Sequence, residues 1–263
     1  MDIQLAGKNA LVCGSSQGIG KAAAIELASL GANVYLFARN QASLSQVKDL
    51  LDTSQGQNHE ILIGDFAKPE EIQSIISDYI EEHNKVFHIL VNNTGGPAGG
   101  PILAAEPNAF LQAYHQHLLC NHLLAQAVIP GMTREAYGRI INVISISVKT
   151  PIAGLGVSNT TRGAVASWAK TLAAEVAPFG ITVNNVLPGF TDTERLRSIV
   201  RSRAEKAGVS YEEMEETMIR SVPARRFGEA SETAAAIAFL ASPAAAFING
   251  VNLPVDGGQT PSM

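Results

Sequence analysis

The stretch NALVCGSSQGIGKA, residues 9–22, predicts the fold of this protein. Its first part, NALVCG, is a short apolar run that ends at a glycine, as a buried strand does. A helical stripe follows, closed by Gly31 and formed by Ile19, Ala23, Leu27 and Leu30. Gly14, Gly18 and Gly20 join the two elements, where glycine permits a tight turn and lets a phosphate approach the N–H groups of the helix N-terminus. The pattern predicts a nucleotide-binding loop; the alternative is a plain glycine turn.

Strand-like and helical patterns alternate through the rest of the chain. Further short apolar runs lie at 33–38, 60–65, 88–93, 139–145, 181–187 and 251–256. Helical patterns separate them, with Pro69 opening a helix near 69–82 and others near 107–129, 158–177 and 231–241. This alternation predicts a single α/β domain over residues 1–263, with a Rossmann-like, doubly wound parallel sheet of about seven strands and helices on both faces. Ligands bind such sheets at the carboxyl ends of the strands.

The composition is that of a globular protein with a sizeable core, and it argues against several classes of partner. Hydrophobic residues make up 46% and charged residues 16% of the 263 residues. The net charge of −5 offers no basic footprint, so we expect no nucleic-acid partner. No apolar run approaches the ~20 residues of a membrane span, so we expect no membrane partner. Cys13 and Cys120 form no disulfide framework, and MDIQLAGKNALV lacks a signal-peptide layout, so we expect a cytoplasmic protein.

Six segments, taken in order, resemble the short-chain dehydrogenase/reductase family. They are CGSSQGIG (13–20), GDF (64–66), LVNNTGG (90–96), GRIINVIS (138–145), NNVLPGFTDT (184–193) and INGVNLPVDGG (248–258). The segment 222–250 is most similar to the β-ketoacyl-acyl-carrier-protein reductases of that family. The resemblance implies an NAD(P)-dependent oxidoreductase that acts on a small-molecule carbonyl or alcohol, 3-oxoacyl-like and carrier-linked in those members. It also implies a homo-oligomer, a tetramer or a dimer.

The resemblance assigns cofactor-binding roles one position at a time. The phosphate loop corresponds to Gly14, Ser16, Gly18, Ile19 and Gly20. Asp65 corresponds to the carboxylate that binds the adenine amino group, and Asn93 and Gly95 correspond to the ribose-side stretch, with Thr94 in place of alanine. The loop that meets the nicotinamide amide corresponds to Pro188, Gly189 and Thr193. The family's substrate-covering segment falls at about 190–222.

The end of the second strand favours NADP over NAD. An acidic residue there would accept hydrogen bonds from a ribose 2′-hydroxyl and repel a 2′-phosphate. The chain instead reads FARN (37–40), without a carboxylate. Arg39 offers a fork of donors to a phosphate. The alternative interpretation is that Arg39 is a solvated loop residue.

The catalytic positions depart from the family pattern. Its members usually carry a serine, a tyrosine thirteen residues later, a lysine four further on, and an asparagine on the preceding helix. Ser145 fits the first place, whereas Ser158, Arg162 and His117 replace the tyrosine, the lysine and the asparagine. The family's proton donor is therefore missing from its usual position.

The replacements still allow a reductase site of a different kind. A tyrosine with a pKa near ~10 can be tuned to donate a proton, but a serine hydroxyl is far less acidic. We expect Ser145 and Ser158 to donate hydrogen bonds to the substrate carbonyl and Arg162 to stabilise negative charge on its oxygen. His117 would supply the proton, because histidine ordinarily titrates near neutral pH. The alternatives are a buried helix histidine at 117 and a strand-end serine at 145.

Two functional hypotheses therefore stay open. The first is an NADP-dependent oxidoreductase with a non-standard proton-transfer site, favoured by Ser145 and by the charge of Arg162. The second is a catalytically silent dinucleotide-binding homologue, a sensor or partner subunit, favoured by the loss of tyrosine and lysine. The basic stretch 195–206 is either a solvated helix face or a surface for an acidic carrier or a phosphorylated substrate. We expect no metal site, because His117 lies opposite His115 and His122 on a helix.

Overall fold

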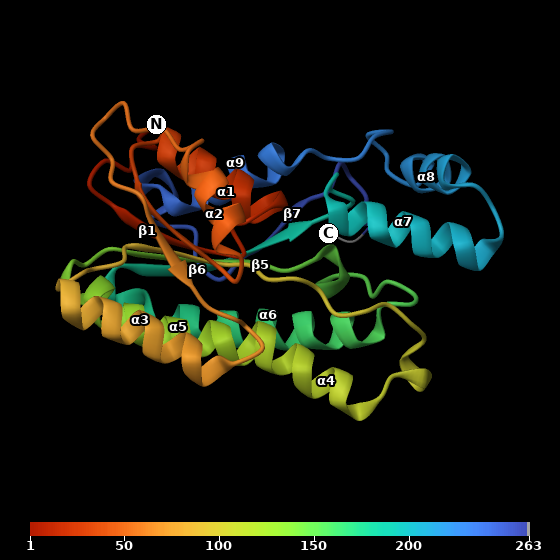
Figure 1. Ribbon diagram of the computed structural model, residues 1–263, viewed down its shortest axis with the longest axis horizontal. Helices are drawn as coiled ribbons and strands as arrows, with labels where there is room; N and C mark the ends of the chain where they lie inside the picture. Colours follow the sequence, from red (N-terminus) through yellow and green to blue (C-terminus); the bar gives the residue numbers. More distant parts are fainter. Residues whose placement is uncertain (262–263) are drawn as a thin grey trace.

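A seven-stranded parallel sheet forms the centre of the computed structural model, which describes residues 1–261 (Figure 1). Its strands are β1 (Asn9–Cys13), β2 (Asn33–Ala38), β3 (Glu60–Ile63), β4 (Ile89–Asn92), β5 (Gly138–Val143), β6 (Ile181–Pro188) and β7 (Asn252–Val255). All seven predicted strands are confirmed, with ends that differ from the prediction by two residues or fewer. The apolar runs and the glycines beside them were sufficient to locate the strands, because buried parallel strands appear in sequence as near-continuous apolar runs.

The order of the strands creates a switch point in the middle of the sheet. The order is β3-β2-β1-β4-β5-β6-β7, so the chain builds outward from β1 in one direction and then outward from β4 in the other. The loops that follow β1 and β4 diverge at this point. A crevice therefore opens at the carboxyl ends of the central strands, where doubly wound sheets bind their ligands.

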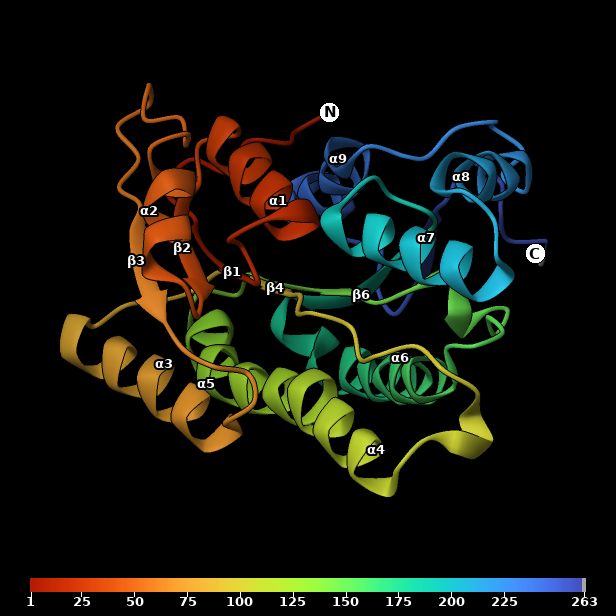
Figure 2. The same cartoon turned by 45° about the vertical axis from the view of Figure 1, so that its right-hand side comes forward.

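Helices cover both faces of the sheet (Figures 1 and 2). One face carries α1 (Gly18–Ser29), α2 (Gln41–Lys48) and α9 (Ala230–Ala241). The other carries α3 (Pro69–His83), α4 (Pro107–Tyr114), α5 (Cys120–Arg134) and α6 (Gly156–Val176). Short 3₁₀ turns lie at η1 (Ile102–Ala104), η3 (Ile146–Val148), η4 (Ala177–Phe179) and η5 (Pro243–Ala245). The predicted doubly wound architecture is thus confirmed.

Two further helices stand apart from the sheet faces. They are α7 (Glu194–Ala207) and α8 (Tyr211–Arg220), which pack together beyond the carboxyl ends of the strands (Figure 2). The serine hydroxyl of Ser210 caps α8 by accepting a hydrogen bond from the backbone N–H of Glu213 at 3.1 Å. The pair corresponds to the segment 190–222 that the sequence assigns to covering the substrate.

The predicted helix near 107–129 is longer and less regular than expected. It runs from α4 through a π-helical segment, η2 (His115–Leu119), into α5. It also continues through Pro130, a residue that usually ends a helix. Gly131 and Met132 beyond the proline are buried, and this packing extends the helix to Arg134.

Buried side chains form an apolar layer on each face of the sheet. Leu27 of α1 and Ile237 of α9 belong to one layer, and Ile72 of α3 and Leu124 of α5 belong to the other. Within the described residues, no helix is long and apolar enough to cross a membrane.

A row of asparagines crosses four strands of the sheet. The side-chain amide of Asn92 donates to Oδ1 of Asn142 at 2.9 Å, and Asn142 donates to Oδ1 of Asn185 at 2.9 Å. Asn185 then donates to Oδ1 of Asn252 at 2.8 Å at the exposed end of the row. These residues are paired in register on β4, β5, β6 and β7. The row ties together the strands whose ends form the crevice.

Candidate cofactor and substrate cleft

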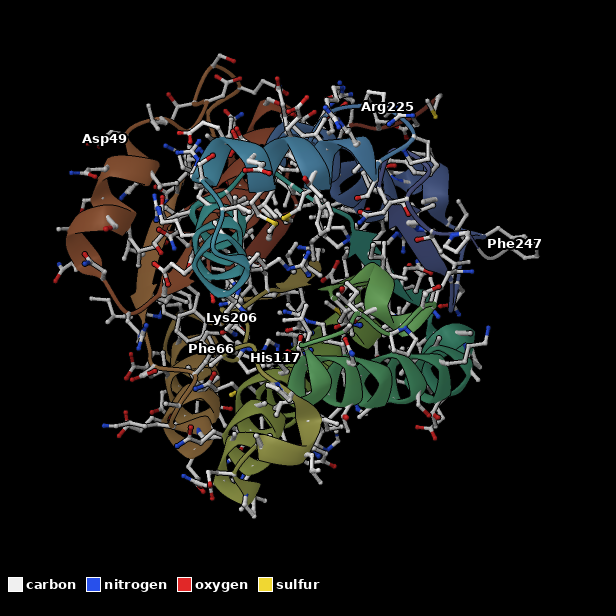
Figure 3. All side chains as sticks on the ribbon, turned by 90° about the vertical axis from the view of Figure 1, so that its right-hand side faces the viewer. Asp49, Phe66, His117, Lys206, Arg225 and Phe247 are labelled. Atoms are coloured by element: carbon white, nitrogen blue, oxygen red, sulfur yellow. The ribbon has the colours of Figure 1, made fainter. Side chains whose placement is uncertain are left out.

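A cleft of about 670 Å³ lies at the carboxyl ends of the strands. Residues from the loops after β1 to β6, from the starts of α1 and α6 and from α7 line it. Figure 3 faces this end of the molecule and labels Phe66 and His117 in the region between α7 and α4. Of the sixteen site residues predicted from the sequence, all except Gly20 and His117 line this one cleft. The sheet topology therefore brings them together from the loops after six strands and from α6.

The phosphate loop is held rigidly between two neighbouring strands. Gly14 and Gly18 have positive φ angles of 58° and 55°, which glycine adopts without strain. The N–H of Gly14 donates to the carbonyl oxygen of Phe37 at 2.8 Å, and the N–H of Phe37 donates to Oγ of Ser15 at 3.0 Å. From the other side, Nδ2 of Asn93 lies 3.3 Å from the carbonyl oxygens of Cys13 and Gly14. The sequence did not predict this bracing role of Asn93.

Gly20 packs against the loop and does not line the cleft. A Cβ added at Gly20 would collide with the carbonyl oxygen of Gly14 and would lie 2.8 Å from Nδ2 of Asn93. Gly20, predicted as part of the phosphate loop, therefore supports the turn from behind in this geometry, and its cofactor-binding role stays a prediction. Its lack of a side chain lets α1 begin directly behind the turn.

A cation and an anion mark the end of the cleft beside β2 and β3. Nη1 of Arg39 lies 3.8 Å from Oδ1 of Asp65, and the Arg39 side chain is 74% exposed. Oδ1 of Asp65 also accepts a hydrogen bond from the N–H of Ala67 at 3.0 Å. Asn40 caps α2, accepting at Oδ1 from the N–H of Ser43 at 2.9 Å. This end thus presents one guanidinium and one carboxylate to a ligand.

The loop after β6 meets the phosphate loop from the opposite side. Pro188, Gly189 and Thr193 line the cleft. Oγ1 of Thr193 accepts from the N–H of Leu196 at 3.4 Å and so caps α7. The Thr193 methyl group lies 3.3 Å from the place that a Cβ of Gly18 would occupy. The helix cap made by Thr193 and the contact of its methyl group with the Gly18 turn together hold this loop in place across the cleft.

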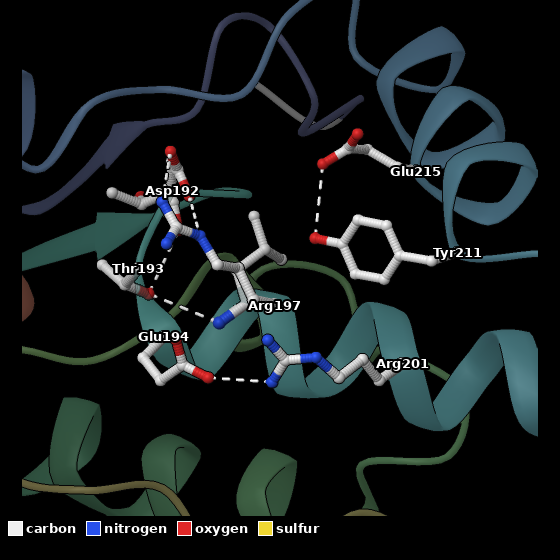
Figure 4. A network of polar contacts seen from close by, with 9 residues as sticks. Asp192, Thr193, Glu194, Arg197, Arg201, Tyr211 and Glu215 are labelled. Carbon is white, nitrogen blue, oxygen red and sulfur yellow. Dashed lines mark hydrogen bonds and ion pairs between the residues drawn. The ribbon is translucent and has the colours of Figure 1, made fainter.

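Two of the five basic residues in the stretch 195–206 pair with nearby carboxylates (Figure 4). Arg197 pairs with Asp192 at 3.0 Å, and Arg201 pairs with Glu194 at 2.8 Å. Arg203 lies over the ring of Phe190 at 5.9 Å from its centroid. Of the expected alternatives, these contacts fit a solvated helix face. Arg195, the first residue of the stretch, behaves differently, because it lines the cleft.

Ser145, Ser158 and Arg162 all line the cleft, and Arg162 follows Ser158 by one turn of α6. Oγ of Ser145 accepts from the N–H of Ser147 at 3.1 Å, so its own proton stays available. Ser158 lies in the first turn of α6, and its hydroxyl makes no hydrogen bond to another described residue. Nη1 of Arg162 donates to the carbonyl oxygen of Val143 at 2.9 Å. Burial, with a smaller contribution from Arg195, lowers the pKa of Arg162 to about 10.

His117 does not match the role expected from the sequence. It lies in the π-helical segment, is only 4% exposed and does not line the cleft. Burial, followed by the nearby charge of Arg162, lowers the pKa of His117 to about 3. The expectation of a proton source that titrates near neutral pH is therefore wrong. The alternative, a buried helix histidine, fits, and its Nε2 atom has no hydrogen-bond partner among the described residues.

Two tyrosines near this region and the other histidines of the helix lie outside the cleft. Tyr114 is 49% exposed outside the cleft, and the hydroxyl of Tyr137 donates to the carbonyl oxygen of Ala241 at 2.7 Å. No tyrosine or lysine is found among the described residues that line the cleft. His115 and His122 are exposed, whereas His117 is buried. Residues 1–261 contain no cluster of histidine, cysteine and acidic side chains that could hold a metal ion.

Sequence reasoning missed Arg195 as a cleft residue. Its Nη2 atom donates to the carbonyl oxygen of Pro97 at 2.6 Å, which brings α7 against the loop after β4. The charge pattern of 195–206 was the available signal. It could not separate Arg195 from its neighbours, because only the direction of α7 decides which arginine faces the sheet.

Comparisons with known proteins agree with this geometry. A family model described as enoyl-(acyl carrier protein) reductase matches residues 14–260. The 3-oxoacyl-[acyl-carrier-protein] reductase FabG of Vibrio cholerae is 34% identical over 98% of this chain and 99% of its own length. The NADPH-dependent reductase BacG of Bacillus subtilis is 30% identical over 97% of this chain and 99% of its own. The solved structure of L-sorbose reductase from Gluconobacter frateurii, complexed with NADPH and L-sorbose, has a TM-score of 0.92 at 28% identity and covers 100% of both chains.

Proposed function

The chain belongs to the short-chain dehydrogenase/reductase family, and on that premise we propose that it is an NADPH-dependent carbonyl reductase with a non-standard proton-transfer site. The observation that carries this proposal is the cleft itself. One cavity is lined both by the phosphate loop with Arg39 and by Ser145, Ser158 and Arg162. The names of the relatives FabG and BacG support a carbonyl substrate and the use of NADPH.

The residues of the cleft fit a dinucleotide. The glycine turn at Gly14 and Gly18 would hold the phosphates, and Thr193 with its loop would hold the nicotinamide amide. Asp65 would bind the adenine amino group, and Arg39 would bind the 2′-phosphate of NADPH. When bound, the reduced nicotinamide supplies a hydride to a carbonyl carbon.

The protein would then stabilise the oxygen of the reacting carbonyl. Ser145 and Ser158 each have a hydroxyl proton to donate to that oxygen. Arg162 keeps its charge throughout, because even its lowered pKa of about 10 lies well above neutral pH. A fixed cation of this kind favours the negative charge that develops on the oxygen.

Proton delivery would pass through Ser158. A phenol is absent from the described lining, and His117 is neutral at pH 7. The hydroxyl of Ser158 would donate its proton to the negatively charged oxygen that hydride addition leaves on the substrate, which makes the alcohol. Ser158 would regain a proton from water in the open cleft. Arg162 would favour the transient negative charge on either oxygen. The apolar residues Ile146, Ile152 and Leu155 line the same cleft and suit an acyl chain, which supports a 3-oxoacyl-like substrate.

Two measurements test the proposal. The first is a fluorescence titration of the purified protein with NADPH and with NADH, for which we expect micromolar binding of NADPH and much weaker binding of NADH. The second follows NADPH consumption with a panel of 3-oxoacyl thioesters, ketones and keto sugars.

Arg162→Ala should lower kcat about 10²–10³-fold, as loss of an oxyanion donor does, with a far smaller effect on stability. Ser167→Ala, on the exposed side of the same helix, is the matched control.

A second candidate function is a catalytically silent protein that binds the dinucleotide as a sensor or partner subunit. The observation that favours it is the absence of tyrosine and lysine from the described cleft lining. Tight NADPH binding without consumption on any substrate would support this alternative. Failure to bind either dinucleotide would contradict both functions.

A further inference from the structure

Two arginines from distant parts of the chain meet beside Gly96. Arg162 comes from α6 and Arg195 from the start of α7. Their Nη2 atoms lie 3.6 Å and 3.4 Å from the position that a Cβ would occupy on Gly96. All three residues line the same cleft. Because Gly96 has no side chain, the point between the two guanidinium groups stays open to a ligand.

Neither of these arginines has an acidic partner among the described residues. Five other arginines, at positions 39, 197, 201, 220 and 226, each pair with a carboxylate at 3.8 Å or less. Glu194 lines the cleft next to Arg195, but its carboxylate is engaged by Arg201 at 2.8 Å. The positive charge beside Gly96 is therefore not compensated by the protein.

The two guanidinium groups also have unused donors. Arg162 donates to the carbonyl oxygen of Val143, and Arg195 donates to the carbonyl oxygen of Pro97. A guanidinium carries five N–H donors, so most of them remain free. Each charge is partly removed from water, and burial lowers the pKa of both groups, with Arg195 adding to the effect on Arg162. Two like charges in such a place are unfavourable without an anion.

We propose that Arg162 and Arg195 form the binding site for an anionic group of the substrate, a carboxylate or a phosphate. The inference rests on the proposed reductase function and narrows it to carbonyl compounds that carry a negative charge. Arginine forks bind both groups through paired hydrogen bonds. Ser158 lies one turn before Arg162 on α6, and Arg162 donates to Val143 two residues before Ser145, so the carbonyl and the anionic group would be held at neighbouring positions. Arg195 is then a specificity residue, and Arg162 acts on both groups.

The test compares substrates that differ only in charge, in wild type and Arg195→Gln. The carboxylate arm uses 3-oxohexanoate and its methyl ester. The phosphate arm uses dihydroxyacetone phosphate and dihydroxyacetone, in which the phosphate lies next to the carbonyl. We expect Arg195→Gln to raise KM for at least one anionic substrate by more than tenfold, with kcat changed less than threefold. KM for the matched neutral compound should change less than twofold. The arm that responds identifies the anion.

Controls separate this site from the cofactor and from general charge effects. Arg197→Gln removes a charge from the same helix, but its partner is Asp192 and it does not line the cleft. It should leave all the KM values within twofold of wild type. The NADPH dissociation constant should not change in Arg195→Gln. A rise in that constant would mean that Arg195 binds the cofactor phosphates, and it would overturn the proposal. Equal effects on anionic and neutral substrates would overturn it as well.

A binding measurement keeps the inference testable if the protein does not turn over. Calorimetry would measure the binding of 3-hydroxyhexanoate and of glycerol 3-phosphate to the NADPH-bound protein. NADPH cannot reduce either compound further at its hydroxyl carbon. We expect Arg195→Gln to weaken at least one of them more than tenfold. Binding of the anions with no turnover would contradict the reductase function alone. Turnover of neutral substrates without any selectivity for anions would contradict the anion site alone.

Discussion

Arg39 and Asp65 face each other at 3.8 Å across the ends of β2 and β3, where the adenosine end of a dinucleotide would lie. Their separation and exposure make the ion pair weak, so Arg39 can reorient to a phosphate at little cost. The first prediction is that Arg39→Ala raises the dissociation constant of NADPH about tenfold and leaves that of NADH within twofold. Fluorescence titration measures both. Equal weakening of the two cofactors would contradict a 2′-phosphate contact.

The buried asparagine row provides the second prediction. Asn142→Ala would leave the amide of Asn92 and Oδ1 of Asn185 without their partners inside the sheet. We expect the free energy of unfolding to fall by about 2–4 kcal/mol, as when buried polar groups lose their hydrogen bonds. Asn252→Ala, at the exposed end of the row, should cost less than about 1 kcal/mol. Urea unfolding of both variants would measure the difference, and equal costs would show that the row is not a connected unit.

The third prediction concerns stability in acid. Burial lowers the pKa of His117 to about 3 and that of His88 to about 4, while an unfolded histidine titrates near ~6.5. Below pH 6.5 the unfolded chain binds protons that the folded chain does not, so the free energy of unfolding falls as the pH falls. The contribution of His117 is lost between about pH 6.5 and 3.

His117→Asn isolates this effect. Between pH 7 and pH 4 the variant should lose about 3 kcal/mol less stability than wild type, because one acid-sensitive group is gone. His122→Asn is the control, since His122 is exposed. Chemical denaturation at a series of pH values gives the slope of the unfolding free energy against pH for both variants. If His117→Asn has the same slope as wild type, the His117 ring must be protonated in the folded wild-type protein.

The fourth prediction addresses the missing tyrosine and lysine. Activity of the wild type should be nearly independent of pH between about 6 and 9, because His117 titrates at about 3 and Arg162 at about 10. The double variant Ser158→Tyr/Arg162→Lys places a phenol beside an ammonium in the cleft. The pH profile of its kcat/KM should show a titration above neutral pH. Its kcat/KM on neutral ketones should rise at least tenfold. A flat profile in the double variant would argue against proton delivery at position 158.

The sequence by itself determined the fold and most of the residues that line the end of the cleft beside β1 and β2. Buried parallel strands appear in sequence as apolar runs, and glycines mark their turns, so the strand pattern and the loop from Gly14 to Gly20 could be located without coordinates. Arg39 was likewise found from its place at the end of a predicted strand. These features depend on neighbours in the chain, which the sequence shows directly.

The tertiary structure decided the chemistry at the other end of the cleft. The pKa of His117 depends on how completely α6 and the loop after β4 cover it, and no local pattern encodes that burial. Arg162 and Arg195 are separated by more than thirty positions in the chain, yet their guanidinium groups converge on Gly96. Electrostatic interactions depend on distance and desolvation in space, so only the folded chain identifies which charges remain without a partner.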